Sequence, residues 1–192
     1  MTSPPRNRPD LGPGPVTLSD PSAALGAVLR LSIEHLWWTN RRLLDATQRL
    51  PDGAWATADH LTARDLRSTL VHELDVEWSW RLALEGRPAA EWAEAEELKP
   101  VDFPTVAALR ERWIVEADAL RDWVASLSAT DLVEETHPGL SSRPLPRWMF
   151  VQHLVSHGAQ QAADAATILS AAGASPGDIG FLEYIGEGHG RG

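Results

Sequence analysis

Four long segments carry apolar residues at the three- and four-residue spacing of an α-helix, and this feature constrains the fold more than any other. They span residues 21–49, 62–85, 104–128 and 145–172. No segment shows the alternating pattern of a β-strand. Four amphipathic helices of this length bury their apolar faces most simply against one another. The sequence therefore predicts an all-α protein with the architecture of a four-helix bundle.

Helix-ending and helix-starting residues support these boundaries. Pro51 to Gly53 follow the first segment, and Gly86 and Gly173 follow the second and the fourth. Thr62 and Asp65 stand at the spacing of a capping box, with Asp in place of the usual Glu. We therefore expect the second helix to begin near residue 62.

The two ends of the chain differ from the predicted helices in composition. The first residues, MTSPPRNRPDLGPGPV, are rich in Pro and Gly and have no apolar core, so we expect a disordered tail over residues 1–18 and no signal peptide. The bundle domain is expected over 19–187, followed by a flexible C-terminus over 188–192. No apolar run approaches the ~18 residues that a membrane span requires.

Charge and cysteine content exclude several classes of function. The formal net charge is −10, which disfavours binding to nucleic acid or to an anionic membrane surface, because both require basic residues. The chain has no cysteine, which excludes disulfides, a protein thiolate nucleophile and zinc–sulfur ligation. These features favour a cytoplasmic protein whose partner is a small molecule or another protein.

The stretch VQHLVSHGAQQAADAATIL, residues 151–169, is the strongest candidate for a functional site. His153 and His157 are one helical turn apart, so both imidazoles can reach one divalent metal ion. Gln161 lies one turn further on. At about 100° per residue, Gln161 and His157 point toward the apolar face and His153 lies at its edge. His72, in the middle of the second helix, is the candidate ligand from another helix. The alternative is a polar stripe on an ordinary helix.

Other polar residues have a structural and a functional interpretation. Asp164 is a solvated carboxylate, or it accepts a hydrogen bond from a ligand or acts as a base. Glu77 lies in the apolar arc of the second helix, where it is buried or pairs with an Arg. Asn40 makes a structural hydrogen bond or binds a ligand, and Trp80 and Trp148 pack in the core or line a pocket. The remaining histidines are interpreted as surface or loop residues: His35, His60, His137 and His189.

Several of these motifs together resemble the DinB family, also described as DinB/YfiT-like. The resemblance rests on LVHELDVEWSW around His72, on the His153 and His157 segment, and on SAAGASPGDIGFLEYI after it. WWTNRRLLDATQRLP in the first helix is similar to the opening region of that family. The resemblance covers about residues 22–185 and is to an actinobacterial branch of the family. The composition, rich in Ala, Arg, Leu and Pro, fits a high-GC genome.

The resemblance implies a four-helix bundle that holds a divalent metal ion through three histidines. His72 and His157 match two of them, and Gln161 stands where the family has the third. Three arrangements follow. Gln161 ligates through its carbonyl oxygen, or the site uses His72, His153 and His157, or the metal is lost. Zinc and nickel are the candidate metals, and a carboxamide is a weaker ligand for them than an imidazole.

The resemblance also implies a chemistry. Characterised relatives include transferases and isomerases that use a low-molecular-weight thiol, and mycothiol is the natural candidate co-substrate here. A metal ion lowers the pKa of a bound thiol and holds it as the thiolate. The rival interpretation is a metal-free small-molecule-binding or stress-response protein with a degenerate site. A homodimer is a further expectation, because bundles of this family often pair through helix faces.

Overall fold

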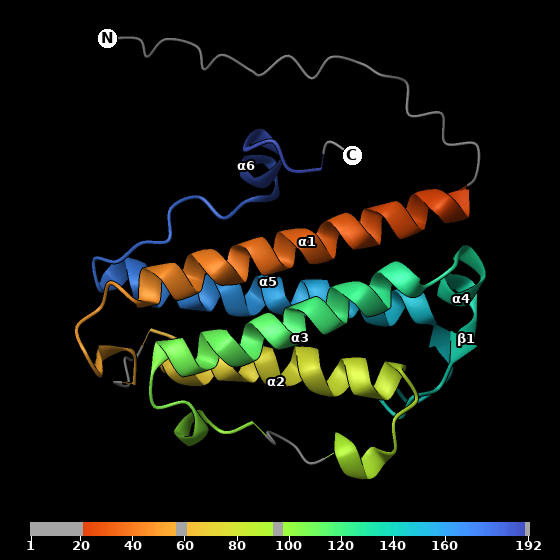
Figure 1. The fold of residues 1–192 in the computed structure, drawn as a ribbon, viewed down its shortest axis with the longest axis horizontal. Coiled ribbons are helices and arrows are strands. Elements are labelled where there is room, and N and C mark those ends of the chain that lie inside the picture. Colours follow the sequence, from red (N-terminus) through yellow and green to blue (C-terminus); the bar gives the residue numbers. More distant parts are fainter. Residues whose placement is uncertain (1–20, 57–60, 94–97, 191–192) are drawn as a thin grey trace.

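A computed structural model of the chain describes residues 21–56, 61–93 and 98–190. The predicted tail over 1–18 lies outside the described residues, as does His60. Four long helices lie side by side: α1 (Pro21–Thr47), α2 (Leu66–Leu84), α3 (Val106–Ser126) and α5 (Arg147–Ala171) (Figure 1). The prediction of an all-α bundle is confirmed. Helix α5 packs against both α1 and α2, and α3 packs against the same two helices.

Short elements lie between and after the long helices, and one of them, at residues 145–146, takes the first two positions of the predicted fourth helix. Helix α4 (Ala129–Val133) and the two-residue strands β1 (Glu135–Thr136) and β2 (Leu145–Pro146) lie between α3 and α5. The strands pair antiparallel, so the expectation of no strand was wrong for these residues. The remaining elements are three 3-10 turns and the last helix: η1 (Ala54–Ala56), η2 (Ala89–Glu91), η3 (Pro100–Asp102) and α6 (Phe181–Gly186).

The start of α2 differs from the prediction and has a local cause. Asp65, not Thr62, is the N-cap, and its carboxylate accepts a hydrogen bond from the Ser68 backbone N–H at 2.7 Å. The Thr62 hydroxyl instead donates to the Arg64 carbonyl at 2.6 Å. An Asp carboxylate satisfies an N-terminal N–H well, and it therefore fixes the first turn three residues later than expected.

Two glycines end helices in the way the sequence predicted. Gly86 after α2 and Gly173 after α5 have φ values of 79° and 76°. This left-handed conformation is easy for glycine and strained for other residues, so each chain reversal is fixed by its glycine. None of the described helices is both long enough and apolar enough to cross a membrane.

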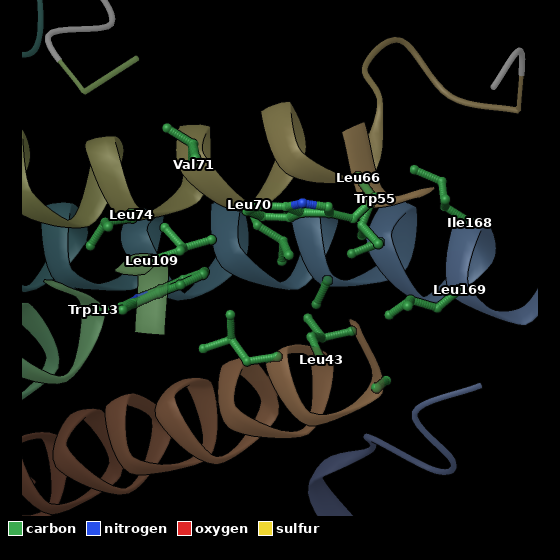
Figure 2. Packing of buried hydrophobic residues seen from close by; sticks show 14 of the residues in the cluster. Leu43, Trp55, Leu66, Leu70, Val71, Leu74, Leu109, Trp113, Ile168 and Leu169 are labelled. Carbon is green, nitrogen blue, oxygen red and sulfur yellow. The ribbon is translucent and has the colours of Figure 1, made fainter. Parts of the chain in front are cut away.

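The apolar core has two parts. Figure 2 shows the first, in which side chains of α1, α2, α3 and α5 pack around the Trp55 and Trp113 rings. The second part lies around Leu29, Leu120 and Phe150, toward the α4 end of the bundle. Each long helix contributes to both parts, and this continuous burial is the main stabilising contribution.

A layer of buried polar side chains separates the two parts of the core. Asn40, Glu73, Glu77 and Glu116 are each at most 2 % exposed. On α1, for example, Asn40 lies between Leu36 in one part and Leu43 in the other. Burying carboxyl groups is costly unless they find partners, so this layer needs a structural or functional explanation.

The chain after α5 turns back along α1 (Figure 1). Arg49 donates to the carbonyls of Ala174 and Ser175, and the His35 ring lies 3.0 Å from the Ile179 carbonyl. Near the end, Trp38 donates to Glu187 at 2.9 Å. These bonds hold the C-terminal segment against α1.

Candidate functional site

His72 on α2 and His157 on α5 meet in the polar layer. Their Nε2 atoms are 3.3 Å apart, and their rings meet edge to face with centroids separated by 5.1 Å. The sequence predicted that these two residues belong to one site. The structure brings them together across the interface between α2 and α5.

Glu73 holds the other side of the His157 ring. Its Oε2 atom lies 2.7 Å from His157 Nδ1. The Glu73 side chain is 2 % exposed, while the His157 side chain is 15 % exposed. A histidine whose Nδ1–H donates to a carboxylate has its Nε2 lone pair free for a metal ion, and such carboxylates orient metal-binding histidines in many proteins.

Glu77 extends this network into the core. Asn40 donates to Glu77 Oε1 at 2.8 Å, and the Trp113 indole N–H donates to Oε2 at 2.8 Å. The sequence left open whether Glu77 would be buried alone or paired with an Arg. It is buried and held by these two neutral donors, whereas Arg81 pairs with Glu116.

Burial sets the protonation of the two carboxyl groups. It raises the pKa of Glu73 to about 8. It also raises the pKa of Glu77 well above its usual value, and the charge of Glu73 adds to that shift, although the Trp113 hydrogen bond opposes it. Both groups therefore favour the protonated form more strongly than a carboxyl group in water does.

The histidine pKa values move in the opposite direction. Burial lowers the pKa of His157, and the nearby positive charge of Arg64 lowers it further. Burial and the neighbouring His157 lower the pKa of His153. Both rings are therefore neutral at pH 7, which is the form that binds metal ions.

Gln161 and His153 occupy different positions relative to this pair. The Oε1 atom of Gln161 is buried and has no hydrogen-bond partner among the described residues. The His153 ring stacks on Trp80, with centroids 4.4 Å apart and planes 13° from parallel, and its centroid is 6.3 Å from that of His157. His153 is also exposed, as its place at the edge of the helix predicted.

Gly158 allows the helices to approach closely beside the site. A Cβ atom at this position would lie 2.3 Å from Leu36 Cδ1 and 2.5 Å from Glu73 Oε1. Real Cβ atoms do not come so close to other atoms. The absence of a side chain therefore leaves room for the Glu73 carboxyl group next to α5.

The interpretation of His35 as a surface or loop residue was wrong. Its ring is half-buried on α1, contacts the Ile179 carbonyl and packs near Trp38, Phe181 and Tyr184. The partner is 144 residues away in the sequence, so helical spacing could not reveal it. His137 is exposed in a loop, as predicted.

Glu73 is the site residue that the sequence analysis missed. A signal was present, because Glu73 and Glu77 are four residues apart and follow Leu66 and Leu70 along the same face of α2. Two carboxyl groups in an apolar stripe indicate a buried network rather than a solvated face. The identity of the partners required the tertiary structure.

Within the described ranges, no group of three or more His, Cys, Asp or Glu side chains is arranged to hold a metal ion. Gln161, as an amide, lies outside those four residue types.

The sequence model of the DinB family matches residues 24–187. No curated protein matches the chain.

Proposed function

The chain belongs to the DinB family, and from this membership we propose that it is a divalent-metal-dependent enzyme whose metal ligands are His72, His157 and Gln161. Its reaction is the transfer or isomerisation of a small-molecule substrate with a low-molecular-weight thiol, mycothiol being the candidate. The observation that carries the proposal is the 3.3 Å separation of the two histidine Nε2 atoms.

This separation fits two ligands of one metal ion. Two nitrogen ligands about 2.0–2.1 Å from a tetrahedral zinc ion lie about 3.3 Å apart. The Nδ1 atom of His157 is engaged by Glu73, so Nε2 is the nitrogen available for a metal ion. Without a metal ion, the same 3.3 Å separation fits a hydrogen bond from one Nε2–H to the other Nε2, so metal content distinguishes the two states.

Gln161 is a suitable third ligand for the metal ion. Its buried carbonyl oxygen lacks a donor among the described residues, and an unpaired buried acceptor is costly. A cation beside His157 would satisfy it. His153 remains the alternative third ligand, but its stacking on Trp80 favours Gln161. Zinc and nickel both accept two imidazoles and an oxygen ligand.

The chain's own residues supply orientation and proton acceptance. When bound here, a divalent metal ion would supply Lewis acidity that lowers the pKa of a thiol or water ligand. Glu73 fixes the orientation of the His157 ring. Glu77, one turn further along α2, is itself fixed by hydrogen bonds from Asn40 and Trp113. His153, exposed and neutral at pH 7, can accept a proton from an arriving thiol.

The thiol part of the proposal rests on family resemblance together with the absence of cysteine. With no cysteine in the chain, a sulfur nucleophile must come from a co-substrate. A metal-activated thiol from solution meets that need. The rival proposal is a metal-free small-molecule-binding protein. It has the same fold, but Gln161 does not bind a metal ion.

Metal content is the decisive test. Protein purified without a His tag should contain about one divalent ion per chain by elemental mass spectrometry. His157→Ala should lose it, and the control His137→Ala, an exposed loop substitution, should keep it. No metal after incubation with zinc or nickel would contradict the proposal and favour the metal-free rival. If metal binds, the cobalt-substituted protein should gain a sulfur-to-cobalt charge-transfer band when mycothiol is added.

A further inference from the structure

A second site lies on the other side of α5 from the histidine pair. A half-open cavity of about 350 Å³ lies between α1, α5 and the segment around Ile179 and Gly180. Its volume falls within the range of small-molecule pockets, which is about 300–1,000 Å³. The α5 wall consists of small and apolar residues: Val155, Gly158, Ala159, Ala162 and Ala163.

This cavity is separate from the proposed metal site. Ala159 is two residues after His157, so it projects about 200° away around the helix. His157 faces Glu73 and His72 on α2, whereas the cavity faces α1. Gly158 lies between the two sites, with the Glu73 carboxyl group near it on one side and the cavity on the other.

The α1 side of the cavity carries its polar groups. Thr39 and His35 line it, together with Leu36. The Ile179 carbonyl can only accept a hydrogen bond, so His35 Nε2 at 3.0 Å carries the hydrogen and donates it. The Thr39 hydroxyl, 3.4 Å from the same Nε2, therefore cannot donate to it.

The Thr39 hydroxyl is left with an unused hydrogen. Its side chain is 4 % exposed, and the His35 ring is its only hydrogen-bonding contact in the described part of the chain. Thr47 and Thr167, on the same two helices, instead donate to the carbonyl four residues earlier. A buried hydroxyl in a cavity wall without an acceptor is a site for a ligand oxygen.

We propose that this cavity binds a small, uncharged and mainly apolar molecule that carries one hydrogen-bond acceptor. The alanine and valine side chains and Leu36 contact its apolar body, and the Thr39 hydroxyl donates to its acceptor. The lining has no carboxylate, lysine or arginine to pair with a charged ligand. The C-terminal segment is bound to α1 through its own backbone carbonyls, so it forms the rim of the cavity and does not fill it.

Acetophenone and cumene are suitable probes, because they have similar shapes and only acetophenone has an acceptor. Nuclear magnetic resonance of labelled alanine methyl groups reports the location of binding. Acetophenone should shift the methyl signals of Ala159 and Ala163 and leave that of Ala171 unchanged. Ala163→Phe, at an exposed position of the lining, should weaken binding at least tenfold, and the control Ala171→Phe should not.

Thr39→Val tests the polar contact. This near-isosteric change should weaken acetophenone binding about five- to tenfold, as expected for one hydrogen bond, and should change cumene binding less than twofold. Equal effects on both probes would overturn the role of Thr39. No methyl shift up to the solubility limit, or tight binding by Ala163→Phe, would overturn the site.

The test is independent of the metal proposal. Acetophenone should bind equally well to His157→Ala and to protein treated with a chelator. Loss of binding in both would assign the probe to the metal site and contradict a separate cavity. Failure to find metal leaves the expected acetophenone result unchanged, so the two proposals can fail separately.

Discussion

The Glu73 carboxyl oxygen lies 2.7 Å from Nδ1 of His157, although the two residues are 84 positions apart in the sequence. This contact joins α2 to α5 in the middle of the core. It orients the ring whose other nitrogen faces His72. Because Glu73 is buried and His157 is partly exposed, the contact connects the interior network with the surface.

The buried carboxyl groups should make stability depend on pH. The pKa of Glu73 rises from 4.5 in the unfolded chain to about 8 in the fold, so between these values the folded state binds more protons. Stability therefore falls as pH rises through this window. The lowered pKa values of His153 and His157 act in the opposite direction, but only below about pH 6.5. Between pH 6.5 and 8, the raised pKa of Glu73 therefore acts without the opposing effect of His153 and His157.

We expect metal-free protein to lose about 1–2 kcal/mol of unfolding free energy across that interval. Chemical denaturation at several pH values measures it. Glu73→Gln should make the dependence weaker, with the part due to Glu77 remaining, and the exposed control Glu111→Gln should leave it unchanged. If the unfolding free energy of the unsubstituted protein were constant or rose from pH 6.5 to 8, the prediction would be wrong, because burial would then not raise the pKa of Glu73.

Glu73→Gln should also weaken metal binding. A metal ion bound to His157 would favour the ionised form of Glu73. The amide keeps an acceptor for His157 Nδ1–H, but it cannot supply that negative charge. Removing such an orienting carboxylate typically costs ten- to a hundredfold in affinity. Competition with a chromogenic zinc chelator measures the change, with Glu111→Gln as the control. Unchanged zinc affinity would remove Glu73 from the proposed function.

Substitutions of Gln161 test the third ligand directly. Gln161→His restores an imidazole, which binds zinc and nickel better than a carboxamide, so the zinc affinity should rise at least tenfold. Gln161→Leu has a similar size and no donor atom, and it should lower the affinity at least tenfold. If His153 were the third ligand, both variants would bind zinc as the unsubstituted protein does.

Gly158→Ala should destabilise the fold more than a helix propensity scale predicts. Alanine normally stabilises a helix by up to about 1 kcal/mol relative to glycine. Here its Cβ would collide with Leu36 and Glu73, so we expect a loss of about 1–3 kcal/mol. Thermal unfolding measures the loss, and Gly26→Ala on α1, whose closest neighbour is a flexible Arg30 side chain, is the control. A stabilised Gly158→Ala protein would contradict the close packing described here.

The sequence by itself determined the four helices, because their apolar periodicity and glycine ends act locally. It also determined that His72 and His157 are candidates for one site, since the His pair on the last helix and the family motifs point to them. The position of Gln161 one turn beyond His157 follows from helix geometry alone. These features depend on residues close to one another in the sequence or on motifs of consecutive residues.

The tertiary structure decided which side chains are partners. Glu73 with His157, Asn40 with Glu77 and His35 with Ile179 are contacts between distant segments. The stacking of His153 on Trp80, which sets it apart from Gln161, is another. A helical pattern specifies which face is buried, but not which residue of another helix meets it. That choice depends on the register and crossing of the packed helices, which only the assembled core fixes.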